Sequence, residues 1–254
     1  MHESELWITR IFNDHLAWLG NALLNLANSL FAALHIHANL HPEARPWANY
    51  ITMQILVALV VIVTVALLRP RLSPDRPGRF QHTMELIYDF VHGQGEEQVG
   101  PAAARYLAFF GTIFIFVLVC NLIGIIPGFE SPTMTPAVPF GCALAVFMYY
   151  NLMGIQAHGI FRYLRNFAGP MIALAPLMVP IEIVSHIARL LSLTVRLTAN
   201  IYAGEQITLI FLRLTFFVFP VAFMGLHIFV GVLQAYVFML LTMMYVAGAV
   251  AHEH

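Results

Sequence analysis

Lysine is absent from this sequence, and charged residues of any kind are scarce. Only 10% of the 254 residues are charged, against about 25% in a typical soluble domain, and the twelve basic residues are all arginine. With 60% hydrophobic residues and a mean hydropathy of +0.78, the composition predicts a single domain built for lipid. A net charge of −1 excludes the basic surface typical of nucleic-acid binding. Because a guanidinium keeps its proton, every fixed positive charge in the chain is permanent.

Cysteine is nearly absent as well. Cys120 and Cys142 lie in apolar runs, as small core residues do, and this excludes a disulfide framework. Two groups of histidines have the spacing of metal tracts, but they fall in a predicted surface segment and at a terminus, without cysteine nearby. These are His35, His37, His41, His252 and His254. We therefore expect no metal and no cofactor. The opening residues MHESELWITR place acids before any base, so we expect no secretory signal.

Three apolar stretches have about the length that a helix needs to cross a bilayer: 49–68, 106–126 and 138–155. The loops after the first and the third are basic, whereas the loop IPGFESPTMTP after the second has no base. The arginines of these basic loops are Arg69, Arg71, Arg76, Arg79, Arg162 and Arg165. Since short basic loops stay in the cytoplasm, we expect the start of the first span and the N-terminus outside, and the C-terminus inside.

Two further segments are predicted to lie along the membrane rather than to cross it. Residues 80–99 mix apolar side chains with four acids, too many for a span, and are expected at the cytoplasmic interface. Residues 16–36 carry three asparagines on one helical face, which favours an interfacial helix over a span, although a span stays open. We therefore divide the chain into an N-terminal interfacial segment, 1–48, and one membrane domain, 49–254.

The last part of the chain is apolar over lengths that exceed a perpendicular span. As one helix, residues 169–214 would be about 69 Å long, whereas the hydrocarbon core is about 30 Å thick. The stretch must be strongly tilted, bent near Pro176 and Pro180, or broken near Gly204. Residues 220–250 are also overlong. We predict an all-α membrane protein of about five spans, in which 170–214 and 220–250 form a long, strongly tilted hairpin.

A polar stripe runs along the first of these long segments. On a helical wheel its members fall within about 80° of arc on an otherwise apolar helix. They are Glu182, His186, Arg189, Arg196 and Asn200. Ionisable groups at membrane depth cost about 2.5 to 3.5 kcal/mol each and mark ion paths, proton relays or ligand sites. Taken singly, either arginine could instead snorkel to an interface or pair with Glu182 as structural support.

The second long segment carries a matching face made of His227, Gly231, Gln234 and Tyr245. Facing each other, the two stripes would satisfy their donors and acceptors and leave room for water. Taken alone, His227 is more typical of a packing histidine, and Gln234 and Asn200 of interhelical hydrogen bonding. Glu205 lies off the stripe.

Residues Ser192 to Glu205, SLTVRLTANIYAGE, resemble the signature of subunit a of ATP synthases, where an arginine is followed four residues later by asparagine and then by Ala-Gly. The runs LH at 226–227, LQAY at 233–236 and Tyr245 resemble the last helix of that family. The runs NLIG at 121–124 and PGFESPT at 127–133 resemble its second-span loop. The resemblance covers roughly residues 49–254.

This resemblance implies a channel and stator subunit without catalysis of its own. Arg196 would face a ring of two-helix c subunits, each with one membrane-embedded carboxylate, and b-type stalk subunits would be further partners. Glu182 and His227 match positions of the outer half-channel, with Gln234 and Asn200 near the arginine. Secondary candidates for the proton path are Glu205, His186, Arg189 and Tyr245. The histidine and the lack of other carboxylates on the face favour protons over sodium.

The alternatives belong to other classes. A self-contained proton-coupled transporter commonly shows repeats of its span pattern, and none is visible here. A membrane hydrolase would need a nucleophile or metal motif, and neither H-E-x-x-H nor G-x-S-x-G occurs. The expected location is a bacterial plasma membrane.

Overall fold

The computed structural model describes residues 5–33, 45–68, 78–126, 128–160, 163, 175–214 and 218–250. Within these ranges the chain is helical and has no strand. The helices are α1 Trp7–Ala33, α2 Asn49–Leu68, α3 Arg79–Val99, α4 Leu107–Ile123, α5 Ala137–His158, α7 Ala175–Leu214 and α8 Val218–Val250, with short 3-10 turns η2 Pro101–Arg105 and η3 Pro132–Met134. Both histidine tracts and five of the six loop arginines, all except Arg79, lie outside the described residues.

The predicted spans correspond to described helices. Four of these are long and apolar enough to cross a membrane, namely Asn49–Leu67, Ala137–His158, Pro176–Leu212 and Val221–Val250. The second predicted span, 106–126, is the shorter apolar helix α4, which ends at Ile123 because the chain turns at Gly124. A side chain at Gly124 would collide with the backbone of Ser131, so the turn is tightly packed. The all-α membrane fold is confirmed.

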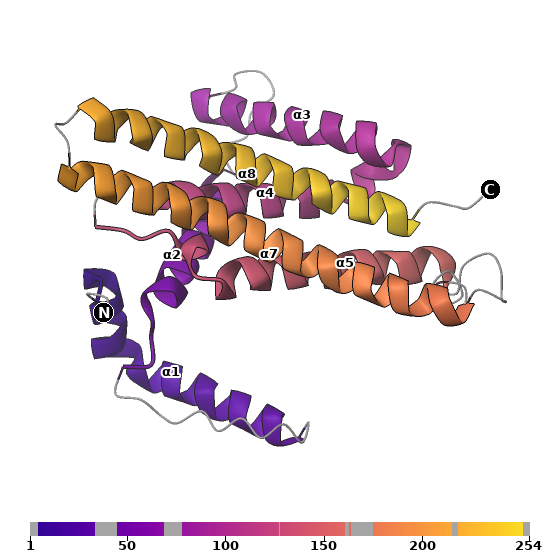
Figure 1. Ribbon diagram of the computed structural model, residues 1–254, viewed down its shortest axis with the longest axis horizontal. Helices are drawn as coiled ribbons and strands as arrows, with labels where there is room; N and C mark the ends of the chain where they lie inside the picture. The colour runs from indigo at the N-terminus through magenta and orange to yellow at the C-terminus, as the bar shows by residue number, and fades with distance from the viewer. Residues whose placement is uncertain are drawn as a thin grey trace.

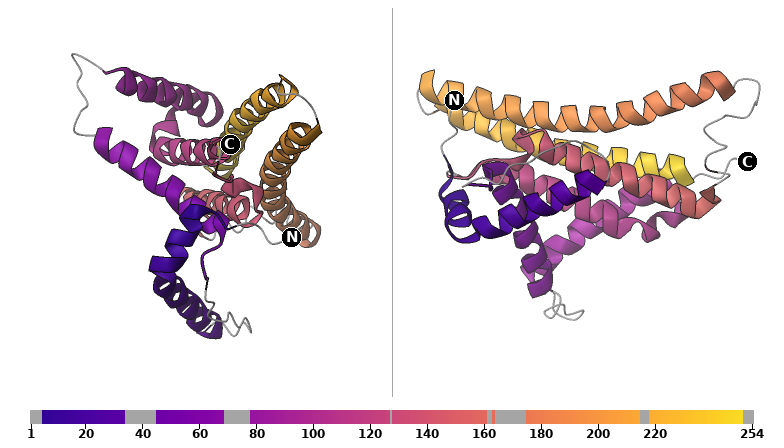
Figure 2. Two further views of the ribbon diagram at one scale, coloured as in Figure 1. Left: turned by 90° about the vertical axis from the view of Figure 1, so that its left-hand side faces the viewer. Right: turned by 90° about the horizontal axis from the view of Figure 1, so that it is seen from below.

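The two longest helices form the predicted hairpin. At about 1.5 Å per residue, the 40 residues of α7 and the 33 of α8 extend for about 60 and 50 Å. They lie side by side in opposite directions (Figure 1). In the left view of Figure 2, α4, α5, α7 and α8 are foreshortened, whereas α2 is seen from the side and crosses them. If α2 stands upright in the bilayer, α7 and α8 are therefore strongly tilted.

Helix α7 passes through Pro180 and Gly204 without a break, so its excess length is not removed by a second helix. It is bowed, and its concave side faces away from the other helices (Figure 2, right). Long helices usually curve around their own core, with the convex side outward. The curvature of α7 is the reverse, which leaves a shallow concave surface on the outside of the molecule.

The core lies between α3, α4, α5, α7 and α8. Its fully buried side chains are mostly aromatic or branched; examples are Phe110, Leu197, Ile201, Phe238 and Met239. Helix α3 lies against this core through Val91, which is buried, and through a hydrogen bond from Tyr236 Oη to Gln94 Oε1 of 2.9 Å. Its four acids, Glu85, Asp89, Glu96 and Glu97, are exposed. This arrangement agrees with an interfacial helix.

Helix α1 begins at Trp7, nine residues earlier than the predicted interfacial segment. It is not among the described helices that are apolar enough to cross a membrane, which agrees with the interfacial alternative. It lies apart from the helical body (Figure 1) and packs against the start of α2. The boundary between the segment 1–48 and the domain 49–254 stays a prediction.

The ends of the helices fall into two sets. Asn49, at the start of α2, donates a hydrogen bond of 3.2 Å to Glu130 in the loop after α4. Arg105, before α4, donates one of 3.3 Å to Gln156 near the end of α5. The first set contains the ends predicted outside and the second those predicted in the cytoplasm. The structure therefore groups the helix ends as the loop charges predict.

The loop between α4 and α5 is tied to α8 by Asn121. This buried side chain donates a hydrogen bond of 3.0 Å to the Gly231 carbonyl oxygen and accepts one of 2.8 Å from Thr133 Oγ1. Both partners are buried or close to the core, where an unpaired polar group costs about 1–3 kcal/mol. Asn121 therefore sets the position of this loop relative to α8.

We expect Asn121→Leu to destabilise the protein by about 1–3 kcal/mol, because it removes the buried hydrogen bonds that join Asn121 to the Gly231 carbonyl oxygen and to Thr133 Oγ1. The measurement is thermal unfolding of the purified chain in detergent. Thr112→Ala is the matched control on the same helix, since Thr112 is exposed and bonds only its own helix, at Ala108 O. Equal unfolding temperatures for the two variants would contradict this role of Asn121.

Candidate functional site

The two polar faces predicted from the sequence meet between α7 and α8. Asn200 Nδ2 donates a hydrogen bond of 2.9 Å to Gln234 Oε1, and Gln234 is buried. The guanidinium of Arg189 lies over the ring of Tyr245 at 5.5 Å from its centroid. These contacts lie at separate points along the antiparallel pair, so the polar groups follow the interface over much of its length.

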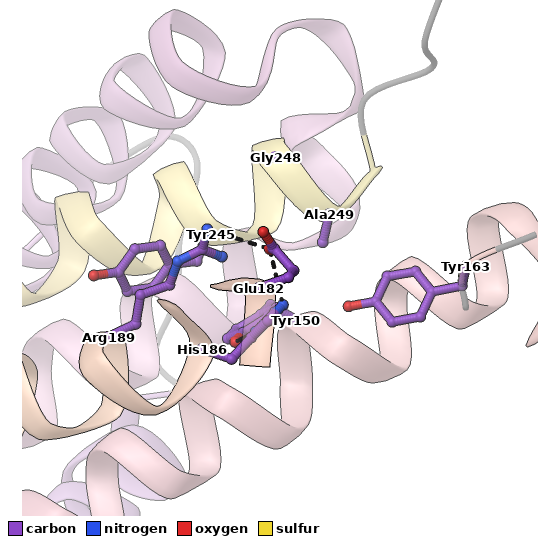
Figure 3. A pocket seen from close by; sticks show the side chains of 8 residues that line it. All are labelled: Tyr150, Tyr163, Glu182, His186, Arg189, Tyr245, Gly248 and Ala249. Carbon is purple, nitrogen blue, oxygen red and sulfur yellow. Dashed lines mark hydrogen bonds and ion pairs between the residues drawn. The ribbon is translucent and has the colours of Figure 1, made fainter. Parts of the chain in front are cut away.

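One cluster of polar side chains lies near the start of α7; we call it the Glu182 cluster. Its members are Tyr150, Glu182, His186, Arg189 and Tyr245 (Figure 3). Glu182 Oε1 is 3.3 Å from His186 Nε2 and 3.8 Å from Arg189 Nη2, and the Tyr150 hydroxyl bonds to His186 Nδ1. Carboxylate, imidazole and phenol are thus joined in one chain of contacts.

The Glu182 cluster lines a cavity of about 160 Å³ that also touches Gly248 and Ala249 at the end of α8. Such a volume holds several waters, each of about 30 Å³ in the liquid, and the lining offers them polar partners. Tyr163 lies at the same cavity and donates a hydrogen bond of 2.8 Å to Asn151 Oδ1. Burial raises the pKa of Tyr163 to about 12, so this phenol stays protonated. The site can hold water in contact with a titratable carboxylate and imidazole.

A second cluster lies toward the end of α7; we call it the His227 cluster, made of Gly204, Glu205 and His227. His227 is 8% exposed, and its Nδ1 has no hydrogen-bond partner among the described residues. The same holds for Oε2 of Glu205, which is also buried. Buried polar atoms without partners are rare and indicate strain, a functional group or an unplaced water. Two of them on adjacent helices indicate a site that exchanges a proton or binds water.

Gly204 makes room for the imidazole of His227. A Cβ at this position would overlap the ring atoms of His227, whereas the same atom at Gly225 of α8 would meet nothing within 4 Å. From the sequence, Gly204 is expected only as a possible break in the helix. The signal that could have revealed its role is a small residue directly before Glu205 on a helix expected to face His227.

Arg196 lies between the two clusters, near the middle of α7. It is half-buried and donates a hydrogen bond of 3.3 Å to Ser192 Oγ, one turn earlier on the same helix. By helix rise it is about 21 Å from Glu182 and about 14 Å from Glu205. Among the described residues it forms no ion pair.

Glu182 and His227 lie far apart in the structure. Glu182 and His227 were assigned to the same half-channel, yet His227 contacts Gly204, and the helix between Glu182 and Gly204 is about 33 Å long. Since α7 and α8 run in opposite directions, Glu182 lies beside the end of α8 and His227 nearer its start. The structure thus places the two residues at different points along the α7–α8 pair, and their assignment to one half-channel stays a prediction. Glu182 belongs with the ends predicted in the cytoplasm.

The fold and the site define a class: a multi-pass helical membrane protein with two separate polar clusters between its longest helices and an unpaired arginine between the clusters. Comparison with known proteins identifies the family. Residues 51–247 match the family described as ATP synthase A chain. The chain belongs to the ATP synthase subunit a family, as the resemblance at Ser192 to Glu205 predicts.

Individual relatives agree. The chain is 64% identical over 244 residues to ATP synthase subunit a of Solibacter usitatus (strain Ellin6076), which covers 96% of this chain and all of the relative. It is 44% identical over 250 residues to the subunit of Koribacter versatilis (strain Ellin345), with 98% of each chain covered. Helicobacter pylori subunit a (strain G27) is 41% identical over 197 residues, 77% of this chain and 87% of the relative. The protein is thus a membrane-sector component of an F-type ATP synthase.

We expect Gly204→Ala to destabilise the hairpin by about 1–3 kcal/mol, because the added methyl group overpacks the contact with His227. Thermal unfolding in detergent measures the effect, with Gly225→Ala as the matched control in open space. Combining Gly204→Ala with His227→Ala should restore most of the loss. If the double variant were as unstable as Gly204→Ala alone, the clash would not be the cause.

Proposed function

We propose that this chain is the proton-conducting stator of the ATP synthase, without catalysis of its own. Protons pass through two half-channels that end at different points along α7, one at the His227 cluster and one at the Glu182 cluster. The observation that carries the proposal is the position of Arg196, an unpaired cation between two proton-carrying clusters about 33 Å apart.

Arg196 requires a carboxylate from another polypeptide. An unpaired ion within the membrane is costly, and the described part of this chain supplies no acid to Arg196. The side chains around it on the exposed side of α7 are small, namely Ser192, Ala199 and Ala203, so another helix can approach closely. The ring of two-helix c subunits, each with one carboxylate, is the partner that fits, and b-type stalk subunits hold the chain against rotation.

The shape of α7 supports this partner. Its concave outer side (Figure 2, right) matches the convex surface of a ring. The exposed side chains of this helix are largely apolar, including Val184, Ile187, Leu191 and Val195. An apolar concave surface with one cation lets a ring site slide past while its ionised carboxylate is attracted to Arg196.

Two half-channels at different positions along α7 turn proton flow into rotation. A proton from outside reaches the ring carboxylate through His227 and Glu205, and after nearly a full turn the carboxylate releases it through Glu182, His186 and Tyr150. Arg196 favours the ionised carboxylate between the two positions. Since arginine cannot donate its proton, it also blocks a direct leak. Asn200 and Gln234 hold α7 and α8 together beside it.

The driving force is the membrane potential, about 2.3 kcal/mol per charge per 100 mV, so several protons are needed per ATP. In this proposal the start of α2 and the N-terminus lie outside, the C-terminus lies in the cytoplasm, and the membrane is a bacterial plasma membrane. The unpaired arginine argues against a self-contained transporter, because such a protein pairs its intramembrane charges within its own chain.

We expect Arg196→Ala to abolish proton-driven ATP synthesis in inverted vesicles, lowering the rate at least about 100-fold, as loss of a central charge-stabilising group does. The complex should still assemble. Arg105→Ala is the matched control, because Arg105 is exposed and outside both clusters. Normal synthesis by an assembled Arg196→Ala complex would reject the role of this arginine.

The two clusters should act on opposite sides of the membrane. In proteoliposomes, His227→Ala and Glu182→Gln should each slow proton flux about tenfold, less than loss of a sole proton-transfer group, since water and neighbours can relay. Lowering the pH outside should partly restore flux in His227→Ala, and changing the internal pH should affect Glu182→Gln. The two-path arrangement fails if both variants respond to the same side.

A further inference from the structure

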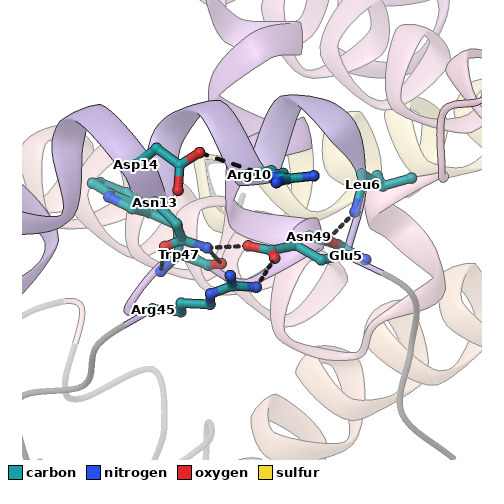
Figure 4. Close-up of polar contacts among 8 residues, drawn as sticks. All are labelled: Glu5, Leu6, Arg10, Asn13, Asp14, Arg45, Trp47 and Asn49. Carbon is teal, nitrogen blue, oxygen red and sulfur yellow. Dashed lines mark hydrogen bonds and ion pairs between the residues drawn. The ribbon is translucent and has the colours of Figure 1, made fainter.

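The N-terminal segment precedes the family match at residues 51–247, yet it is firmly attached to the membrane domain. Asn13 Nδ2 donates hydrogen bonds to Glu5 Oε1 at 2.7 Å and to the Trp47 carbonyl oxygen at 3.1 Å, and Asn13 Oδ1 accepts one of 3.0 Å from the Trp47 amide. Arg45 forms an ion pair with Glu5 (Figure 4). Asn13 and Trp47 are buried, so this contact is a built junction between α1 and the start of α2.

The junction orients the side chain of Asn49. The backbone amide of Leu6 donates a hydrogen bond of 3.2 Å to Asn49 Oδ1 (Figure 4). With its oxygen engaged by Leu6, the amide turns its nitrogen to the other side, where Nδ2 donates a hydrogen bond of 3.2 Å to Glu130 Oε2. The N-terminal segment thereby orients Asn49 so that its Nδ2 donates to Glu130.

Glu130 lies on a loop that is held rigidly against α4 and α7. The neighbouring Ser131 Oγ donates a hydrogen bond of 2.8 Å to the Cys120 carbonyl oxygen, and η3 packs on α7. Phe129 contacts Trp7 of α1 with ring centroids 6.2 Å apart. Glu130 is half-buried and close enough to Glu205 for the two carboxyl groups to interact electrostatically.

The neighbour of Glu130 is the cluster with the two unpaired buried atoms. Oε2 of Glu205 and Nδ1 of His227 are buried without partners among the described residues, and His227 is more than nine-tenths buried beside Gly204. Two carboxyl groups that interact in this way hold one proton between them more readily than two negative charges. Asn121, in the last turn of α4 before the same loop, is bonded to Gly231, one helical turn after His227 on α8. The loop that carries Glu130 therefore lies beside the His227 cluster at the α7–α8 interface.

We infer that Glu130 is the outermost proton-relay residue of the path to the His227 cluster, and that the N-terminal segment acts through Asn49 as its positioning element. The inference rests on the proposed function and extends it to two residues and to a part of the chain outside the family match. The proposed proton relay needs only the two carboxyl groups and water, and no further reactant. The O–H bond of a protonated Glu130 breaks, the proton passes through water to the Glu205 carboxylate, and Glu130 takes its next proton from the outer solution.

Among the described residues, the charged groups near Glu130 lie in two directions. Glu205 interacts with it from α7, while the ion pair of Glu5 and Arg45 lies behind Asn49. The pair is internally neutralised, so the group that responds with Glu130 to outer pH is Glu205. Removal of the carboxyl group at 130 should therefore change how the flux depends on the outer pH.

The test uses the complete ATP synthase in proteoliposomes, with proton flux measured while the pH of each side is varied. Glu130→Gln should lower the flux about tenfold, because the amide still accepts the hydrogen bond from Asn49 but cannot release or take up a proton. The loss should shrink as the outer solution is acidified and should not depend on the inner pH. Glu130→Asp, which restores a carboxyl group, should recover most of the flux. Asp14→Asn is the control, an exposed acid on α1 paired with Arg10 at 3.9 Å.

Asn49→Leu tests the positioning step. It removes the hydrogen bonds that join Asn49 to Leu6 and to Glu130 and should lower the flux about threefold, a smaller loss than that from removing the relay group itself. In a Glu130→Gln background it should cause no further loss, because Asn49 acts through Glu130. A purely structural role would instead add its loss to that of Glu130→Gln.

The outcomes separate this inference from the proposed function. If Arg196→Ala and Glu205→Gln stop the flux while Glu130→Gln behaves like Asp14→Asn, the function stands and the relay role of Glu130 is wrong. If Arg196→Ala leaves the flux intact, the proposed function itself is wrong. Equal losses in Glu130→Gln and Glu130→Asp, independent of outer pH, would also overturn the relay.

Discussion

Hydrocarbon offers no hydrogen bonds, so polar groups between membrane helices must be satisfied by the protein, by enclosed water or by a partner. The interface between α7 and α8 meets this constraint at some points and not at others. Asn200 and Gln234 satisfy each other, and Glu182, His186, Arg189 and Tyr150 form a connected group. The polar groups that remain unsatisfied carry the information about function. In the part of the chain that the structure describes, Arg196 forms no ion pair with an acid, and Glu205 and His227 each have a buried atom without a partner.

These unsatisfied groups are expected if the chain is a single subunit that acts together with a partner, as proposed above. A stator that meets a moving carboxylate has to leave its cation free, because a permanent ion pair within the chain would remove the attraction on which the passing site depends. A path for protons likewise needs polar atoms that water can reach. The reversed curvature of α7 belongs to the same picture, since a helix that wraps its own core would present a convex surface to a ring (Figure 2, right).

The separation of the two clusters follows from the length and direction of the two helices. A perpendicular pair of ordinary spans would place its polar groups above one another, within about 30 Å of depth. Tilting α7 lets Glu182 and Glu205 stand at different depths and also at different positions along the partner surface. The proposed rotary mechanism requires the displacement along the partner surface. A ring carboxylate must travel from the point where it takes up its proton to the point where it releases it.

Much of the fold was predictable from local pattern. Apolar length alone located α2, α5, α7 and α8, and the 3.6-residue period placed Glu182, Arg196 and Asn200 on one face, because both properties are carried by neighbouring residues. The run from Ser192 to Glu205 was enough to indicate the family.

What the sequence determined by itself was therefore the set of helices, their polar faces and the permanent charge of Arg196. Only the tertiary structure decided that Tyr150 contacts His186, that Gly204 makes room for His227 and that Glu182 and His227 lie in separate clusters. A helical wheel records the angle of a side chain but not which helix packs beside it. The antiparallel register of α7 and α8, set by core packing far along the chain, supplies that information.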